Sequence, residues 1–186
     1  MHKIENETSV EVFLIEPTAK LKEEYLQFYN EWVESGESIV PATVDRDPQD
    51  FDHLLKEWQA EKIAENLPEG WVPASTYWLV TKERSIVGAV NIRHGLTEKL
   101  SQSGGHIGYG VRPSARRKGY ASKMLALALE KASELGLDQV LVVCDEINTA
   151  SWKTILKNGG IEDSDYFEVN GNVVKRFWIE VGDNNE

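Results

Sequence analysis

The sequence has few of the features that would place it outside the cell or in a membrane. It contains one cysteine, Cys144, which cannot form an internal disulfide. Its longest apolar runs, residues 124–129 and 140–144, are far too short to cross a bilayer. Residues 1–7 lack the apolar core of a secretory signal. These features predict a protein of the reducing cytoplasm without a membrane-spanning segment.

The sequence also has fewer basic than acidic residues. The 186 residues include 20 Lys and Arg against 31 Asp and Glu, which gives a net charge of −11. This balance argues against general binding to nucleic acid or to anionic membranes. Residues 1–70 carry the whole excess, with 17 acidic and 6 basic groups, whereas residues 71–186 hold 14 of each. Within this neutral part, residues 112–123 contain five basic and no acidic groups, and we call them the basic segment.

Neither a repeat, a low-complexity stretch nor a flexible linker divides the chain. With 41% hydrophobic residues, its length suits one buried core and rules out a disordered tail protein. We therefore expect a single domain over residues 1–186.

Hydrophobic periodicity predicts alternating strands and helices. Strands are expected at residues 10–15, 76–81, 85–93, 105–111, 140–144, 166–169 and 173–181. Helices are expected at residues 21–36, after Asp47-Pro48, at residues 121–135 and at residues 150–157. The order β-α-α-β-β-β-α-β-α-β-β implies an α/β fold with a mixed sheet and helices on its faces.

Three local signals refine this pattern. Asp47-Pro48 is a good N-cap followed by a good first helical residue, so the second helix should begin there. Asn170-Gly171 is a tight-turn signal, which predicts that it joins the last two strands. Aromatic residues recur at helical spacing in the first two helices, and such stripes more often pack in a core than bind a ligand.

The basic segment is the first candidate for a binding site. A strand runs into a turn and then into a helix, so backbone N–H groups at the helix start point outwards and the helix dipole adds partial positive charge. Such a turn suits a phosphate, and Gly119 permits close backbone approach. The alternative is a solvated basic helix start on an acidic protein. A dinucleotide fingerprint fails because Pro113 occupies its third glycine position, and the Gly-Lys-Ser/Thr ending of a P-loop is missing.

Within this segment, Arg116-Arg117-Lys118-Gly119-Tyr120-Ala121 resembles the Arg/Gln-x-x-Gly-x-Gly/Ala signature of the GCN5-related N-acetyltransferase (GNAT) family. Residues 105–111 resemble the central strand of that family. Residues 140–144, followed by Asn148-x-x-Ser151, resemble its next strand and helix.

The resemblance covers about residues 76–181, while residues 1–75 are compatible in layout only. It implies a largely antiparallel mixed sheet with helices on both faces. In this layout residues 1–75 supply an N-terminal strand and acceptor-side helices, and residues 76–181 form the acetyl-CoA-binding core.

The resemblance also implies how a cofactor would bind. The backbone amides of residues 116–121 would hold the pyrophosphate of coenzyme A, and the basic side chains at positions 116–118 would add phosphate contacts. Val111 would pair through its backbone with the pantetheine arm. Asn148 and Ser151 would contact that arm from the opposite side. Acetyl-CoA is therefore the expected cosubstrate.

Transfer to an amine needs a base or a proton-conducting water chain, because an alkyl ammonium with a pKa of about 10.4 must lose a proton first. His106 is the first candidate, since it lies where many relatives have a carboxylate and an imidazole titrates near neutral pH. Gly108 and Gly110 share its strand face and should leave space for an acceptor or water. His94 is the second candidate. Either histidine could instead be structural.

The leaving thiolate needs a proton, and here the sequence departs from the family pattern. Many members have a tyrosine seven residues after the asparagine, where this chain has Ile155. Water, Tyr109, Tyr120 or Tyr166 could replace it. A covalent role for Cys144 is disfavoured, because a lone cysteine in an apolar run is usually a core residue. Four scattered histidines and one cysteine do not suggest a metal site.

The leading hypothesis is an N-acetyltransferase that passes an acetyl group from acetyl-CoA to a small-molecule or peptide primary amine. Because residues 1–70 hold the acidic excess, a cationic acceptor is favoured, unless those carboxylates only lie on exposed helix faces. The rival hypothesis is a non-catalytic acyl-CoA-binding or sensing module, which Ile155 keeps open. The sequence leaves the oligomeric state open, a homodimer included.

Overall fold

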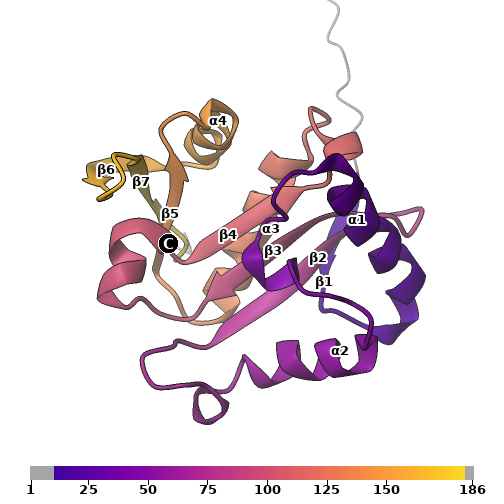
Figure 1. Ribbon diagram of the computed structural model, residues 1–186. Coiled ribbons are helices and arrows are strands. Elements are labelled where there is room, and N and C mark those ends of the chain that lie inside the picture. Colours follow the sequence, from indigo (N-terminus) through magenta and orange to yellow (C-terminus); the bar gives the residue numbers. More distant parts are fainter. Residues whose placement is uncertain (1–10, 183–186) are drawn as a thin grey trace, which may run out of the picture.

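The computed structural model describes residues 11–182, which form one seven-stranded sheet with helices packed against it (Figure 1). The strand order is β1-β2-β3-β4-β5-β7-β6, and the pairs are antiparallel except for the parallel pair β4 and β5. The predicted element order and the mixed, largely antiparallel sheet are confirmed. Val10, expected in the first strand, and residues 1–7 lie outside the described residues.

The elements have the following bounds. The strands are β1 (Val12–Ile15), β2 (Ala74–Thr81), β3 (Ile86–Arg93), β4 (Ile107–Val111), β5 (Gln139–Asp145), β6 (Ile161–Phe167) and β7 (Val173–Glu180). The helices are α1 (Lys22–Ser35), α2 (Phe51–Ala60), α3 (Tyr120–Glu134) and α4 (Thr149–Lys157), with a single π-helical turn at Leu100–Gly104.

The first two helices cover one face of the sheet through an aromatic core. Tyr25 of α1 stacks on Trp78 of β2 with 4.8 Å between ring centroids, and Trp58 of α2 meets Trp78 edge-on at 5.8 Å. Phe28 and Trp32 of α1 are also buried in this cluster. The prediction that the aromatic stripes form core is therefore confirmed.

The opposite face is covered by α3 and α4. Met124, Leu125 and Ala128 of α3 are fully buried against the strands, and Ile155 of α4 is buried in the same cluster. Consecutive strand residues point to opposite faces, so neighbouring residues of β2 contribute to the two cores in turn.

The second helix begins later than the sequence predicted. It starts at Phe51, and its N-cap is Asp50, whose side chain accepts a hydrogen bond from the N–H of His53 at 3.0 Å. Asp47 instead closes a local turn by accepting from the N–H of Gln49 at 3.0 Å. Both carboxylates satisfy backbone donors, so the sequence offers two competing start signals three residues apart.

The last two strands also differ from the prediction. They form a hairpin, but β6 begins at Ile161 rather than at Tyr166, and residues 168–172 form a connection longer than a two-residue turn. The early part of β6 is polar and irregular, with a register shift between Asp163 and Tyr166, so it lacks the apolar pattern of a strand. In the connection, Asn170 Oδ1 accepts from the N–H of Asn172 at 2.9 Å.

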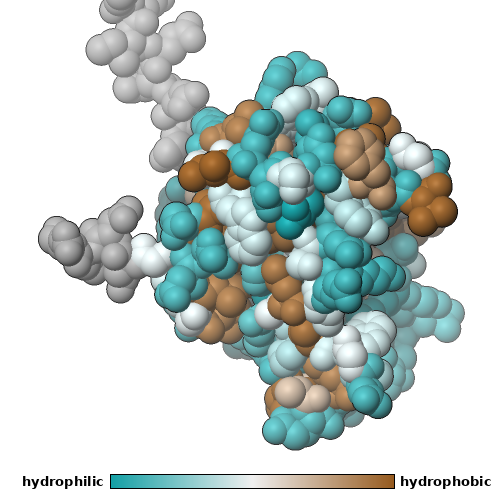
Figure 2. Space-filling view, turned by 90° about the vertical axis from the view of Figure 1, so that its left-hand side faces the viewer, coloured by the Kyte–Doolittle hydropathy of each residue, from teal (hydrophilic) through white to brown (hydrophobic). Residues whose placement is uncertain are grey.

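The described surface offers no element suited to a membrane core. Within residues 11–182, no helix is both long and apolar enough to span a bilayer. Figure 2 shows hydrophobic side chains as separate patches among hydrophilic ones on the flank that it presents.

A wedge between β4 and β5 interrupts the sheet at its centre. The two parallel strands share one paired position, Ile107 with Val142, and the N–H of His106 donates to the carbonyl of Leu141 at 2.7 Å. Beyond this point the strands diverge, as Figure 1 shows. We call the opening between residues 109–111 of β4 and residues 143–145 of β5 the wedge. It leaves backbone groups of β4 without a neighbouring strand.

Candidate cofactor cleft and active site

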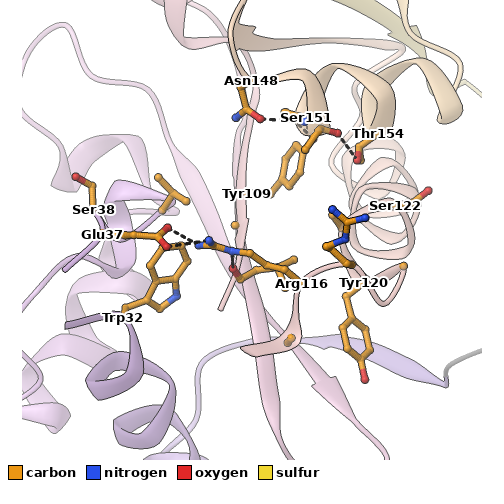
Figure 3. Close-up of a pocket in the computed structure, with 18 residues that line it drawn as sticks. Trp32, Glu37, Ser38, Tyr109, Arg116, Tyr120, Ser122, Asn148, Ser151 and Thr154 are labelled. Carbon is orange, nitrogen blue, oxygen red and sulfur yellow. Dashed lines mark hydrogen bonds and ion pairs between the residues drawn. The ribbon is translucent and has the colours of Figure 1, made fainter. Parts of the chain in front are cut away.

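A cleft of about 570 Å³ opens at the wedge (Figure 3). Its walls come from the end of β4, the turn before α3, the first residues of α3, the face of α4 and the segment that follows α1. Of the nine cofactor residues predicted from the sequence, eight line it: Val111, Arg116, Arg117, Gly119, Tyr120, Ala121, Asn148 and Ser151. Lys118 lies outside this lining, and its Nζ donates to the carbonyl of Ser114 at 3.0 Å.

The start of α3 is built to present backbone donors. Gly119 is the residue before the helix and has φ +82°, a left-handed conformation that glycine adopts without strain. No side chain caps this helix start, so its first N–H groups have no side-chain partner. Uncapped N–H groups together with the helix dipole make a site for an anion.

Two arginines of the basic segment are held by carboxylates, one from α1 and one from Glu37, two residues beyond the end of α1. Arg112 forms an ion pair with Glu31, which also accepts from the N–H of Ser114 at 2.7 Å. Burial by itself would raise the pKa of Glu31, but the hydrogen bonds from Arg112 and Ser114 lower it below its usual value. The acidic excess of residues 1–70 thus partly neutralises the basic segment.

Arg116 lies across the cleft rather than along the turn. Its guanidinium donates to both carboxylate oxygens of Glu37, at 3.0 and 2.8 Å, and lies 5.1 Å from the ring centroid of Trp32. Its Nε donates to the carbonyl of Val111 at 3.2 Å. Figure 3 shows this bridge between the two walls. In this arrangement the Arg116 side chain binds protein groups, whereas the sequence interpretation predicted that it contacts a phosphate of coenzyme A.

The backbone of β4 supplies polar groups to the wedge. The N–H of Arg112 donates to the carbonyl of Val87 in β3 at 2.9 Å. Backbone groups alternate between the two sides of a strand, so Gly110 and Gly108 also face β3, whereas Tyr109 and Val111 face the wedge. The Val111 carbonyl is the one that Arg116 reaches.

The face of α4 that meets the cleft carries three polar residues spaced three apart. Asn148 caps the helix, its Oδ1 accepting from the N–H of Ser151 at 3.1 Å. Thr154 also lines the cleft, and the sequence interpretation missed it. Its spacing from Asn148 and Ser151 is the signal that could have found it, because residues three apart share a helix face.

A hydroxyl pair lies inside the cleft. The hydroxyl of Tyr109 lies 2.9 Å from Ser151 Oγ, and burial raises the pKa of Tyr109 to about 12. Ile155, at the family's tyrosine position, is fully buried in the core and offers no hydroxyl there. Of the other candidate acids, Tyr120 lines the cleft and Tyr166 does not.

Cys144 lies at the edge of this region, but its thiol is not activated as a nucleophile. Burial raises the pKa of its thiol to about 11, so the thiol stays protonated near neutral pH. A nucleophilic cysteine needs thiolate character. The arrangement supports the interpretation of Cys144 as a core residue.

His106 is buried and lies outside the cleft lining. Its Nδ1 accepts from the N–H of Leu141 at 2.9 Å, so in the neutral ring the proton is on Nε2 and no lone pair is left for a substrate. The prediction that Gly108 and Gly110 leave space beside His106 is wrong, because Val40 packs over Gly110 and Pro41 over Gly108. The base role of His106 stays a prediction, and this geometry weighs against it.

His94 lies at the end of β3, also outside the cleft lining. Its Nε2 is 2.8 Å from Ser75 Oγ, and its N–H donates to the carbonyl of Pro73 at 2.8 Å. Burial, with a contribution from the charge of Lys62, lowers its pKa. The contacts of His94 are local ones, and its base role also stays a prediction.

Replacing His106 with glutamine separates the catalytic from the structural interpretation. A base at this position predicts a single-turnover rate about 10²- to 10⁴-fold lower. We expect instead a nearly unchanged rate and an altered pH dependence of unfolding. Burial, aided by the charge of Arg93, lowers the pKa of His106, so the neutral ring adds stability above about pH 6.5 that is lost as pH falls below it.

The measurement compares thermal unfolding at pH 7.5 and 5.5. His106→Gln should lose less stability than the parent chain on acidification, because glutamine does not titrate. A slowed chemical step with the acidic limb of its pH profile removed would instead establish His106 as the base.

Comparisons with known proteins agree with this geometry. A family model described as "Acetyltransferase (GNAT) domain" matches residues 12–161. No curated protein sequence matches the chain significantly. Many solved structures do match it in fold.

Three of these structures illustrate the likeness. The chain aligns over 92% of its length with 96% of a GNAT-family acetyltransferase from Bacillus anthracis, at 16% identity and a TM-score of 0.63. It aligns over 91% with 92% of MccE, the microcin C7 self-immunity acetyltransferase solved with acetyl-CoA and AMP, at 18% identity and a TM-score of 0.61. It aligns over 91% with 94% of mutant forms of the spermidine/spermine N-acetyltransferase SpeG from Vibrio cholerae, at 15% identity and a TM-score of 0.60. At these identities the likeness shows the fold alone.

Proposed function

The chain belongs to the GNAT acetyltransferase family, and we propose that it transfers an acetyl group from acetyl-CoA to a primary amine by direct attack. The observation that carries this proposal is the uncapped start of α3, which opens onto the cleft at the wedge. The pyrophosphate of coenzyme A binds the N–H groups of residues 117–121, where the helix dipole also favours negative charge. The N–H of Arg116, which the sequence interpretation included, already donates to the carbonyl of Pro113 at 3.3 Å.

The pantetheine arm enters the wedge. Its amides pair with the backbone groups of Tyr109 and Val111 that face the wedge, while Asn148 and Ser151 contact it from α4. Binding displaces the Nε of Arg116 from the Val111 carbonyl, because both need the same acceptor. The guanidinium released in this way is then free to approach a phosphate.

The chemical step joins the amine nitrogen to the thioester carbonyl and breaks the carbon–sulfur bond. The ammonium first gives a proton to water or to a base, and the attacking nitrogen loses a second proton as the amide forms. The thiolate of coenzyme A takes up one proton, for which the Tyr109 hydroxyl is the best-placed donor in the cleft. Backbone N–H groups of β4 at the wedge stabilise the tetrahedral oxyanion.

We propose that residues 1–186 act as one domain in the cytoplasm and accept a small-molecule or peptide amine. Spermidine and spermine, named for one structural neighbour, are primary amines and support this class of acceptor. The alternative is a module that binds acyl-CoA without transfer, which the loss of the family's tyrosine at Ile155 favours.

Calorimetry with acetyl-CoA and thiol release in the presence of an amine panel test the proposal together. Binding with amine-dependent release of free thiol is the expected result. Binding without release for every amine would favour the sensing module, and a lack of binding would remove both interpretations.

A further inference from the structure

A second cavity, of about 660 Å³, lies on the face of the sheet that α1 and α2 cover. It is lined by residues after α1 and at the end of α2, by residues 67–74, by the end of β3 and by residues 97–104. None of the residues proposed above for cofactor binding lines it. We call it the acceptor cavity.

The acceptor cavity adjoins the cofactor cleft along β4. Asn91 of β3 lines the acceptor cavity and is paired with Gly108, and the next residue of β4, Tyr109, lines the cleft. Val40 lines the cleft, whereas Ala42 and Thr43 line the acceptor cavity. The segment around Pro41 therefore lies between the two spaces. The acceptor cavity borders β3, which is paired with β4, the strand that binds the pantetheine arm in the proposed function.

The charge of the acceptor cavity is positive, in contrast to that of the chain. Among its lining residues, Arg46, Arg93 and Lys99 are cationic and Glu61 is the one carboxylate, which gives a net charge of +2. Glu61 is already bound to Arg46 at 2.6 Å. The cavity therefore does not suit a polycation, and of the acidic groups in residues 1–70 only Glu61 lines it.

Arg93 is the cationic group best placed to bind an anion. Its Nη1 donates to the carbonyls of Gly104 and Gly105, at 3.1 and 3.0 Å. Within residues 11–182 these two are the hydrogen bonds that its side chain makes, both from Nη1, and it forms no ion pair. Burial lowers the pKa of Arg93, which marks a desolvated charge without a counter-ion. Nε and Nη2 present two parallel N–H groups along one edge of the guanidinium, and such an edge matches the two oxygens of a carboxylate.

The rest of the lining is apolar. Leu67, Val72 and Leu100 contribute aliphatic surface, and Trp71, which also lines the cavity, is 68% exposed to solvent. An exposed indole next to aliphatic side chains suits an apolar or aromatic group of a ligand.

Resting on the proposed acetyl transfer, we infer that the acceptor is an amine that also carries a carboxylate and an apolar group, as an apolar amino acid does. Its carboxylate pairs with Arg93, with Lys99 nearby in the lining. Its apolar group packs against Trp71 and Leu100. Its amine points along β4 towards the wedge.

The test compares amino acids with the amines that differ from them only by the missing carboxylate. The pairs are phenylalanine with phenethylamine and leucine with 3-methylbutylamine, and spermidine is added as a polycation. The readout is kcat/KM for thiol release, corrected for the fraction of neutral amine at the assay pH. We expect each amino acid to exceed its partner by about 10- to 100-fold, as a hydrogen-bonded charge pair provides. Equal or higher values for the decarboxylated amines or for spermidine would overturn the inference.

Substitutions test whether Arg93 causes the preference for amino acids over their decarboxylated partners. In Arg93→Gln the two values of kcat/KM should become nearly equal, and in Arg93→Lys part of the difference should remain because the charge remains. Lys82→Gln is the matched control, since Lys82 is an exposed cation of the β2–β3 connection that lines neither cavity, and it should leave the preference unchanged. If Arg93→Gln unfolds, Lys99→Gln should still lower the preference several-fold, and an unchanged value there would count against the assignment.

Binding measurements keep this inference separate from the proposed function. If no amine releases thiol, phenylalanine and phenethylamine are titrated into the protein by calorimetry with coenzyme A present. Tighter binding of phenylalanine, lost in Arg93→Gln, would support the acceptor cavity while acetyl transfer fails. Equal binding of the two would overturn the inference.

Discussion

Gly119→Val should abolish measurable binding of acetyl-CoA while the protein remains folded. Gly119 has φ +82°, a conformation that a β-branched residue adopts only with strain. No atom lies within 4 Å of the position that a Cβ would take, so the effect comes from the backbone and not from a clash. Relaxing this torsion turns the first N–H groups of α3 away from the cleft. We expect at least about a 100-fold loss of affinity in calorimetry, because each hydrogen bond to a charged group contributes about 1.5–3 kcal/mol.

Gly136→Val is the matched control for this change. Gly136 follows the other end of α3 with φ +83° and also has open space around its Cβ position. Both variants should therefore lose similar stability in thermal unfolding, but Gly136→Val should keep its affinity for acetyl-CoA. Equal affinities of Gly119→Val and the parent chain would refute the phosphate site at this turn.

Tyr109→Phe should slow acetyl transfer by roughly 10²- to 10³-fold, within the range for general acid catalysis. Its hydroxyl lies in the cleft beside Ser151, and its pKa of about 12 keeps it protonated throughout the neutral range. The Tyr109 hydroxyl can therefore donate its proton to the leaving thiolate throughout the neutral range. The basic limb of the pH–rate profile should accordingly not show the titration of Tyr109. The affinity for acetyl-CoA should stay nearly the same, because the ring remains.

Single-turnover thiol release measures this step without interference from product release. Tyr120→Phe separates the two hydroxyls that line the cleft, since Figure 3 shows the Tyr120 ring directed away from Ser151. A full rate in Tyr109→Phe with a loss in Tyr120→Phe would transfer the acid role to Tyr120. Full rates in both would leave proton donation to water.

The order of elements could be predicted from the sequence because each element has its own apolar period. Tyr25, Phe28 and Trp32 recur at helical spacing and are buried on one face, as expected. The glycine turn before α3 could also be predicted, since its backbone conformation depends on local residues such as Gly119. The boundaries of α2 and β6 could not, because competing capping residues and a polar edge strand blur the pattern.

The side-chain partners in the site could not be predicted, because they come from distant parts of the chain. Arg116 lies 79 positions from Glu37 in the sequence, and nothing local indicates that these two residues meet. The lone pair of His106 is taken by the backbone of Leu141, 35 positions away. The space over Gly108 and Gly110 is filled by Val40 and Pro41, which the strand pattern does not reveal.

The seam between β4 and β5 links ligand binding to the cohesion of the protein. Strands β5, β6 and β7 join the rest of the sheet through the pair Ile107 and Val142 and through the adjacent hydrogen bonds between His106 and Leu141. A pantetheine arm that pairs with β4 on one side and contacts α4 on the other would connect the two sides of this seam for as long as it is bound. Saturation at about 100 times the dissociation constant adds about 2.7 kcal/mol to the folded state. That energy opposes every opening that separates the two walls of the wedge, so a bound cofactor would hold the C-terminal strands to the rest of the sheet.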